Sequence, residues 1–356
     1  MDERPLNNRR WNHAPRRGSM SLVGAASLIC ITLAAVPARA ALPSVAHRVS
    51  FPGRLVFVNR PFDGTPSTIW TVLPGSSKAT EVAHSKVPII APTFSPSGDE
   101  IAFDRDVDYR YNDARDRMVI ANADGSNKRV IRSACSDECH WIDELDWAPD
   151  GQTILMWRCL GLCPKNGYHS FYAIWSIRTD GTDLQQLSFP GDYTHTNKLN
   201  DHNPDVAPDG NSFAFDRLDD ATGRFTIEIA PITGGTATAI PLPDRLNPGD
   251  PTWTPDGSKI LFQSPADPIY NRAINFYTVN LDGTGLQQIT HYHVPKGQHF
   301  GGLFHPSFSP DGQYISASHI YTPSGFSYLI LSPDGQLVAR IPIEQNANEI
   351  DWGSLG

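Results

Sequence analysis

A short motif that recurs five times constrains this 356-residue sequence more than any other feature. Each copy ends in Pro-Asp-Gly, or Pro-Ser-Gly in the first, and the copies span residues 92–98, 145–151, 204–210, 251–257 and 306–312. Proline presets φ, Asp bonds its own backbone and Gly supplies a positive φ, so each copy predicts a strand, a tight turn and a second strand. Self-similarity at a period of about fifty residues predicts a propeller or a solenoid.

A second set of turns lies between the copies, at residues 74–75, 124–125, 180–181, 234–235, 282–283 and 334–335. Each unit therefore holds two hairpins and four strands, which is one propeller blade. Arg54–Val58 reads as the second strand of a blade without a first strand, and Glu349–Trp352 reads as a first strand without a second. Pairing them completes a sixth blade and leaves no open edge. We predict an all-β, six-bladed, antiparallel β-propeller closed by its C-terminal strand.

The repeated Trp/Phe-Ser/Thr-Pro-Asp-Gly followed by Ile-Ala-Phe, as at residues 101–103, resembles the repeats of TolB-type propellers. The resemblance covers roughly residues 50 to 356 and implies a periplasmic protein-binding role. Similar repeats build the non-catalytic domain of prolyl oligopeptidase-like peptidases and the body of oligogalacturonate lyases. We expect no α/β domain ahead of the propeller, and in this the chain would depart from TolB.

The first forty residues are typical of a signal peptide, with five arginines, an apolar run from Leu22 to Val36, and then Ala38-Arg39-Ala40. We predict cleavage after Ala40, a lead-in over 41–52 and the propeller over 53–356, with an uncleaved anchor as the alternative. Without residues 1–40 the chain has 29 − 6 = 23 basic and 38 − 2 = 36 acidic side chains, a net charge of −13. This acidity argues against nucleic-acid binding. We expect a periplasmic or secreted monomer with no membrane-spanning segment.

Four cysteines remain after that cleavage, and all fall in two neighbouring loops: Cys135, Cys139, Cys159 and Cys163. Export to an oxidising compartment favours two disulfides of undetermined pairing. A zinc ion held by four thiolates is the alternative.

The long connections, at 104–116, 132–144, 158–170, 189–203 and 290–305, should all emerge on one face, which we call the long-loop face. Histidines collect there: His140, His195, His202, His291, His293, His299 and His305. The segment from Gln288 to His293 is similar to the Gln/His metal cluster of oligogalacturonate lyases, which implies a divalent metal at His291 and His293. We expect instead that these are solvated loop histidines and that the protein has no cofactor, with the metal as the alternative.

Three arginines should lie in register on consecutive blades, Arg105, Arg158 and Arg217. Such a sector suits a carboxylate or phosphate group. Alternatively, each arginine pairs with a neighbouring acid such as Asp104, Asp143 or Asp216. Aromatic residues of the same face are Trp141, Tyr193, Tyr292 and Phe300. We expect the ligand to cover the channel mouth and to touch His202, Arg217, His299 and His305.

Two functions follow. A binding module would present the long-loop face to an envelope protein or to a small anionic or carbohydrate ligand. A metal-dependent lyase or hydrolase on an acidic sugar would use the histidine-bound metal and the arginine sector. No Gly-x-Ser-x-Gly elbow occurs, so a serine peptidase would lack its nucleophile. We prefer the binding module, because no complete catalytic set can be named.

Overall fold

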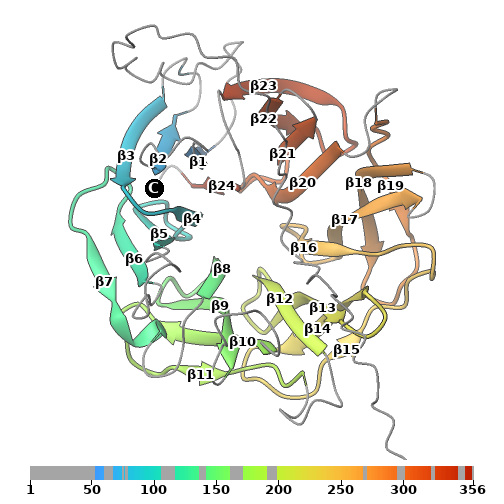
Figure 1. Ribbon diagram of the computed structural model, residues 1–356, viewed down its shortest axis with the longest axis horizontal. Coiled ribbons are helices and arrows are strands. Elements are labelled where there is room, and N and C mark those ends of the chain that lie inside the picture. The colour runs from blue at the N-terminus through green and yellow to red at the C-terminus, as the bar shows by residue number, and fades with distance from the viewer. Residues whose placement is uncertain are drawn as a thin grey trace, which may run out of the picture.

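A computed structural model describes most of the chain after residue 52. The described residues are 53–59, 67–73, 76, 79–105, 117–135, 142–160, 171–190, 199–267, 271–294, 301–321, 325–343 and 349–354. They form 24 strands that surround a central channel (Figure 1). The predicted signal peptide and lead-in lie outside the described residues.

The strands fall into six blades of four, numbered here from the blade that joins the two ends of the chain. Blade 1 holds β24 (Ile350–Gly353), β1 (Arg54–Asn59), β2 (Ser67–Val72) and β3 (Ala79–Ser85). Blade 2 holds β4 (Ile89–Phe94), β5 (Glu100–Arg105), β6 (Arg117–Asn122) and β7 (Arg129–Ile131). Blade 3 holds β8 (Ile142–Trp147), β9 (Thr153–Leu160), β10 (Phe171–Arg178) and β11 (Gln185–Gln186).

The second half of the ring repeats this order. Blade 4 holds β12 (Leu199–Val206), β13 (Ser212–Asp219), β14 (Arg224–Pro231) and β15 (Thr238–Ala239). Blade 5 holds β16 (Gly249–Trp253), β17 (Lys259–Asp267), β18 (Asn271–Asn280) and β19 (Gln287–Gln288). Blade 6 holds β20 (Gly301–Phe308), β21 (Ile315–Tyr321), β22 (Gly325–Leu331) and β23 (Leu337–Ile343). The first strand named in each blade is innermost and the last is outermost (Figure 1).

Blade 1 combines both ends of the described chain. β24 pairs antiparallel with β1, and Trp352 lies opposite Leu55. This is the strand pairing predicted from the two unmatched half-hairpins. The hydroxyl of the buried Tyr328, on β22 of the preceding blade, lies within hydrogen-bond distance of the backbone carbonyls of Val58, at 2.8 Å, and Glu349, at 3.0 Å, which share its one proton. These bonds tie β1 and the start of β24 to blade 6.

The hydrophobic core lies between neighbouring blades. Phe94, the aromatic residue of the first motif copy, packs in one cluster with Val56 of blade 1 and Val119 of its own blade. Trp253, the aromatic residue of the fourth motif copy, packs between blades 4 and 5 in one cluster with Ile227 and Phe262. Burying one such aromatic side chain contributes about 3 kcal/mol. The repeated aromatic residue therefore stabilises the contact between one blade and the blade before it.

The prediction of an all-β propeller of antiparallel blades is confirmed within each described blade. One contact between blades departs from it, because β18 and β20 pair in parallel at Ala273–Gly301 and Ile274–Gly302. Gly302 has a φ of +152°, and a Cβ there would lie 2.5 Å from the backbone nitrogen of Ile274. Only glycine allows this approach, so blades 5 and 6 share one continuous sheet.

Helix is nearly absent from the described residues, where it is confined to the 3₁₀ turn η1 (Arg132–Cys135). None of the helical structure in this part of the chain is long and apolar enough to cross a membrane.

Candidate functional site: the central channel

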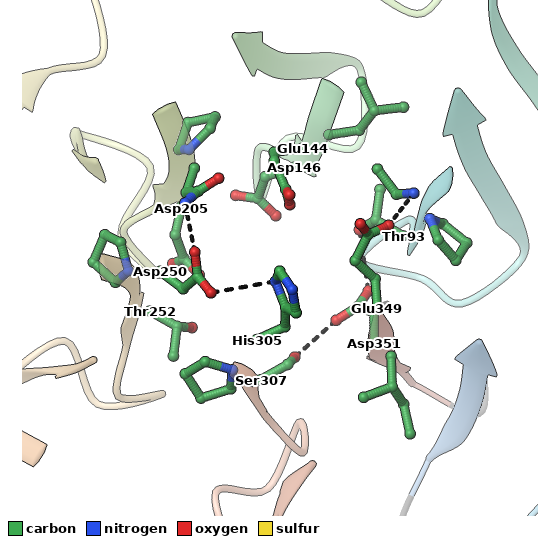
Figure 2. A pocket seen from close by; sticks show the side chains of 18 residues that line it. Thr93, Glu144, Asp146, Asp205, Asp250, Thr252, His305, Ser307, Glu349 and Asp351 are labelled. Carbon is green, nitrogen blue, oxygen red and sulfur yellow. Dashed lines mark hydrogen bonds and ion pairs between the residues drawn. The ribbon is translucent and has the colours of Figure 1, made fainter. Parts of the chain in front are cut away.

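A cavity of about 120 Å³ lies on the propeller axis and is lined by three consecutive residues from each blade. The first residues of these triplets form what we call the mouth ring: Ala91, Glu144, Asn203, Asp250, His305 and Glu349. The third residues form the inner ring: Thr93, Asp146, Asp205, Thr252, Ser307 and Asp351. In each triplet the mouth-ring residue precedes the inner-ring residue along the chain. The chain enters each innermost strand from the long-loop face, so the mouth ring lies nearer to that face. Figure 2 shows the side chains of both rings converging.

A β-bulge in the innermost strand turns the mouth-ring residue toward the axis. Five of the six residues have a left-handed backbone, with φ of 48° at Ala91, 49° at Glu144, 52° at Asn203, 47° at Asp250 and 50° at His305. The pairing register shifts at the same place in those strands, for example between Asp143 and Asp146. A left-handed non-glycine residue costs on the order of 1 kcal/mol, and such strain gathers at functional sites.

The inner ring joins blades to one another through three carboxylates. Asp146 accepts a hydrogen bond from the backbone nitrogen of Val206 at 2.7 Å, and Asp205 accepts one from that of Trp253 at 3.2 Å. Asp351 accepts from the backbone nitrogen of Phe94 at 3.0 Å. Each acceptor therefore lies on one blade and its donor on the next, which makes the channel wall rigid.

Burial raises the pKa of these carboxyl groups. The pKa of Asp205 rises from 3.8 to about 7, chiefly because its carboxylate is desolvated. Burial also raises the pKa of Asp146, to which the charge of Asp205 adds, and the pKa of Asp351. In the mouth ring, burial and the charge of Glu349 raise the pKa of Glu144 well above its usual range. Burial therefore makes each of these carboxyl groups harder to ionise than it would be in water.

On the side of blades 4 to 6 the mouth ring forms a hydrogen-bonded network. Asn203 Nδ2 donates to Asp216 Oδ2 at 2.8 Å and to Asp250 Oδ1 at 2.5 Å. His305 Nδ1 lies 3.3 Å from Asp250 Oδ2, and the backbone nitrogen of His305 donates to Gln263. These contacts hold the imidazole between Asp250 and Glu349 in the view of Figure 2.

The opposite side carries an acidic group around Ala91. One carboxylate oxygen each of Asp143, Glu144 and Glu349 lies within 4.8 Å of the others. Glu349 also accepts a hydrogen bond from the backbone nitrogen of Ala91, while Asp143 accepts one from that of Glu144 at 2.9 Å. Among the described residues this is the group of three whose geometry suits a cation.

The three predicted arginines occupy equivalent positions on β5, β9 and β13, where Arg105 pairs with Ile89, Arg158 with Ile142 and Arg217 with Asp201. Arg217 forms a bidentate ion pair with the fully buried Asp201, at 2.6 and 2.8 Å. The guanidinium of Arg158 lies 4.7 Å from the ring centre of Trp175. The partner of Arg217 is thus Asp201 and not Asp216. A ligand-binding role for the three arginines stays a prediction.

The predicted histidines lie in different surroundings. His305 faces the channel, whereas His202 packs against Trp157 and Tyr172, with ring centres 5.7 and 5.3 Å away. Burial lowers the pKa of His202 to about 4, so it is neutral at physiological pH. His291 and His293 are exposed, and a metal there remains a prediction. His140, His195 and His299 lie outside the described residues, as do the aromatic residues Trp141, Tyr193 and Phe300.

Two of the four predicted disulfide cysteines are described, Cys135 and Cys159, and both are buried. Cys139 and Cys163 fall outside the described residues, so the disulfides remain a prediction.

The carboxylates of the channel were missed by the sequence analysis. A signal was present, because every mouth-ring residue of the five motif copies stands five positions before the proline of Pro-Asp-Gly, as Asp250 does before Pro255. An alignment of the five motif copies shows an acid or an amide at three of these positions, Glu144, Asn203 and Asp250. The inner-ring acids Asp146 and Asp205 stand two positions later.

Comparisons with known proteins place the chain by fold alone. No protein-family model matches the sequence, and no curated protein matches it. Among solved structures, TolB from Acinetobacter baumannii superposes with a TM-score of 0.63 and 18% identity over 84% of this chain. The match spans 66% of that TolB chain, less than two thirds of its length.

Two further structures show how widely this fold is used. A chain of a nidogen/laminin complex superposes with a TM-score of 0.58 at 11% identity, over 84% of this chain and 98% of that chain. Oligogalacturonate lyase from Vibrio parahaemolyticus superposes with a TM-score of 0.50 at 13% identity, over 78% of this chain and 74% of that chain. The chain is therefore similar to TolB and to other propellers in fold.

Proposed function

We propose that this chain, which has a TolB-like propeller fold, is an exported scaffold that binds an envelope protein over the mouth of its channel. The observation that carries the proposal is the mouth ring. One repeated backbone position presents a different side chain from almost every blade, and five of the six hold a left-handed conformation. A rigid scaffold that varies its side chains around one opening is the usual design of a recognition surface.

The expected location is the periplasm or the cell exterior, on the basis of the predicted signal peptide over residues 1–40. Two predicted disulfides would suit that oxidising compartment. A propeller of similar structure belongs to a nidogen/laminin complex, and a role for this chain in binding a protein agrees with that use of the fold.

The lyase on an acidic sugar is less well supported. Its substrate would bring carboxylates toward a mouth that already holds Glu144, Asp250 and Glu349. Like charges in a partly desolvated site repel strongly. The exposed His291 and His293 lie outside this cavity lining. Metal analysis of the purified protein tests the alternative, because a stoichiometric divalent ion lost in H291A/H293A would favour it.

Site-specific photocrosslinking in the producing cell tests the binding scaffold. A photoreactive phenylalanine is placed at Ala221 and at His291, which are exposed toward the long-loop face, and as controls at Asp99 and Ser258 in the turns of the opposite face. We expect one protein to be crosslinked repeatedly from the first pair only. Capture from Asp99 and Ser258 alone would refute the proposal.

A further inference from the structure

We propose that the group of the partner that enters the mouth ring is a basic side chain, a lysine or an arginine. This inference rests on the proposed function and names the chemistry that the channel would recognise. Three observations carry it: the direction of the hydrogen bonds in the wall, the orientation of one amide, and the charges of the lining.

Two hydroxyl groups of the inner ring donate their hydrogen bonds to a neighbouring carboxylate. Thr93 donates to Asp351 at 3.0 Å and Ser307 donates to the same carboxylate at 2.8 Å. A hydroxyl carries a single proton, so each of these groups has only acceptor capacity left for a ligand.

Asn203 adds an acceptor to the mouth. Both neighbours of its amide nitrogen are carboxylates, Asp216 and Asp250, which accept hydrogen bonds when ionised. This assigns the nitrogen to them and leaves Oδ1, which accepts no hydrogen bond in the described part of the chain, as the free atom. Asp216 fixes the orientation of this amide through the hydrogen bond to its nitrogen. Asp216 is 1% exposed, and its Oδ1 has no hydrogen-bond partner among the described residues.

The charges of the lining point to a cation. Glu144, Asp250 and Glu349 line the mouth, and Asp143 lies beside them. No lysine or arginine is among the residues that line the cavity in the described structure. His305 is the one lining side chain that gains a positive charge on protonation, and it already faces Asp250.

A basic side chain complements this site in size and in hydrogen bonding. Lysine offers three donors and arginine five, and neither offers an acceptor. The cavity of about 120 Å³ has room for one such head group and a few waters, and not for a folded segment. The acidic group around Ala91, with one carboxylate oxygen each of Asp143, Glu144 and Glu349 within 4.8 Å of the others, would surround the charge.

The test uses capped pentapeptides, Gly-Gly-X-Gly-Gly, in which X is lysine, arginine, norleucine or glutamate, together with calcium chloride alone. Binding to the full mature chain is measured by titration calorimetry. We expect the lysine or arginine peptide to bind at least ~10-fold more tightly than norleucine, because an ionic hydrogen bond in a desolvated site contributes over 1.4 kcal/mol. The glutamate peptide should not bind.

The variant E144Q removes a carboxyl group whose ionised form a bound cation would favour, and it should weaken binding of the basic peptide by about 10-fold. The matched control D99N removes an exposed charge on the opposite face and should leave binding unchanged. If E144Q does not fold, as judged by its thermal transition, E349Q serves in its place, because glutamine keeps the acceptor for the Ala91 nitrogen.

Three results would overturn the inference: equal binding of all four peptides, no saturable binding of the lysine and arginine peptides, or saturable binding of calcium only. None of these would affect the crosslinking result. A protein captured at the long-loop face whose affinity is unchanged by E144Q would keep the proposed function and refute the basic side chain.

Discussion

The variant D205N should change the pH dependence of stability. Asp205 lies in the inner ring, where its Oδ1 accepts from the backbone nitrogen of Trp253. Its pKa is raised from 3.8 to about 7 by burial, with a contribution from the charge of Asp351. Between these two pH values the folded chain holds a proton that the unfolded chain has released.

The sign follows from linkage. Where the folded state binds more protons, the free energy of unfolding falls as pH rises. The stability tied to this proton is fully present below pH 3.8 and is lost by about pH 7. The difference of about three pH units, at about 1.4 kcal/mol each, corresponds to about 4 kcal/mol, of which about 3 kcal/mol falls above pH 5. Asparagine carries no titrating proton, so the variant should lack this loss.

Urea unfolding followed by tryptophan fluorescence between pH 5 and 8 measures the effect. We expect D205N to gain about 3 kcal/mol relative to the parent protein across this range. Taking the difference between the two proteins cancels the titration that they share. The control D99N, at an exposed turn, should show the same pH dependence of the free energy of unfolding as the parent protein. If D205N also shows the same pH dependence as the parent protein, Asp205 does not hold a proton in the folded channel, and the argument from burial is wrong.

Three shorter predictions address closure, the arginines and the cysteines. W352A should destabilise the protein by about 4 kcal/mol in urea unfolding, because Trp352 is 6% exposed in the core cluster between blades 6 and 1; a loss below 1 kcal/mol would mean that β24 contributes little to stability. R217A should cost about 3 kcal/mol in the same assay, since it leaves the buried Asp201 without its guanidinium; an unchanged transition would leave Arg217 free to serve a ligand. The four cysteines of the exported protein should react with iodoacetamide only after reduction, and labelling of the untreated, unfolded chain would refute the disulfides.

The blades were predictable from local chemistry. Each Pro-Asp-Gly turn specifies its hairpin by the backbone conformations of its own residues, and strand pairing then follows from the hairpin register. The same register explains why Arg217 pairs with Asp201 and not with Asp216, the neighbouring acid named among the alternatives. Asp216 and Arg217 are neighbours on one strand and point to opposite faces, whereas Asp201 stands directly across from Arg217. Register, rather than sequence proximity, decides such a pair.

The channel was not predictable in the same way. Mouth-ring residues such as Ala91 and Asp250 are far apart in the sequence and meet only because the blades surround one axis. The raised pKa of Asp205 depends on desolvation by neighbouring blades, which no local window of sequence contains. Local turn chemistry determined the repeating unit of this protein. Its charged channel arises only when the blades assemble, because burial and the approach of carboxylates from different blades are properties of the whole ring.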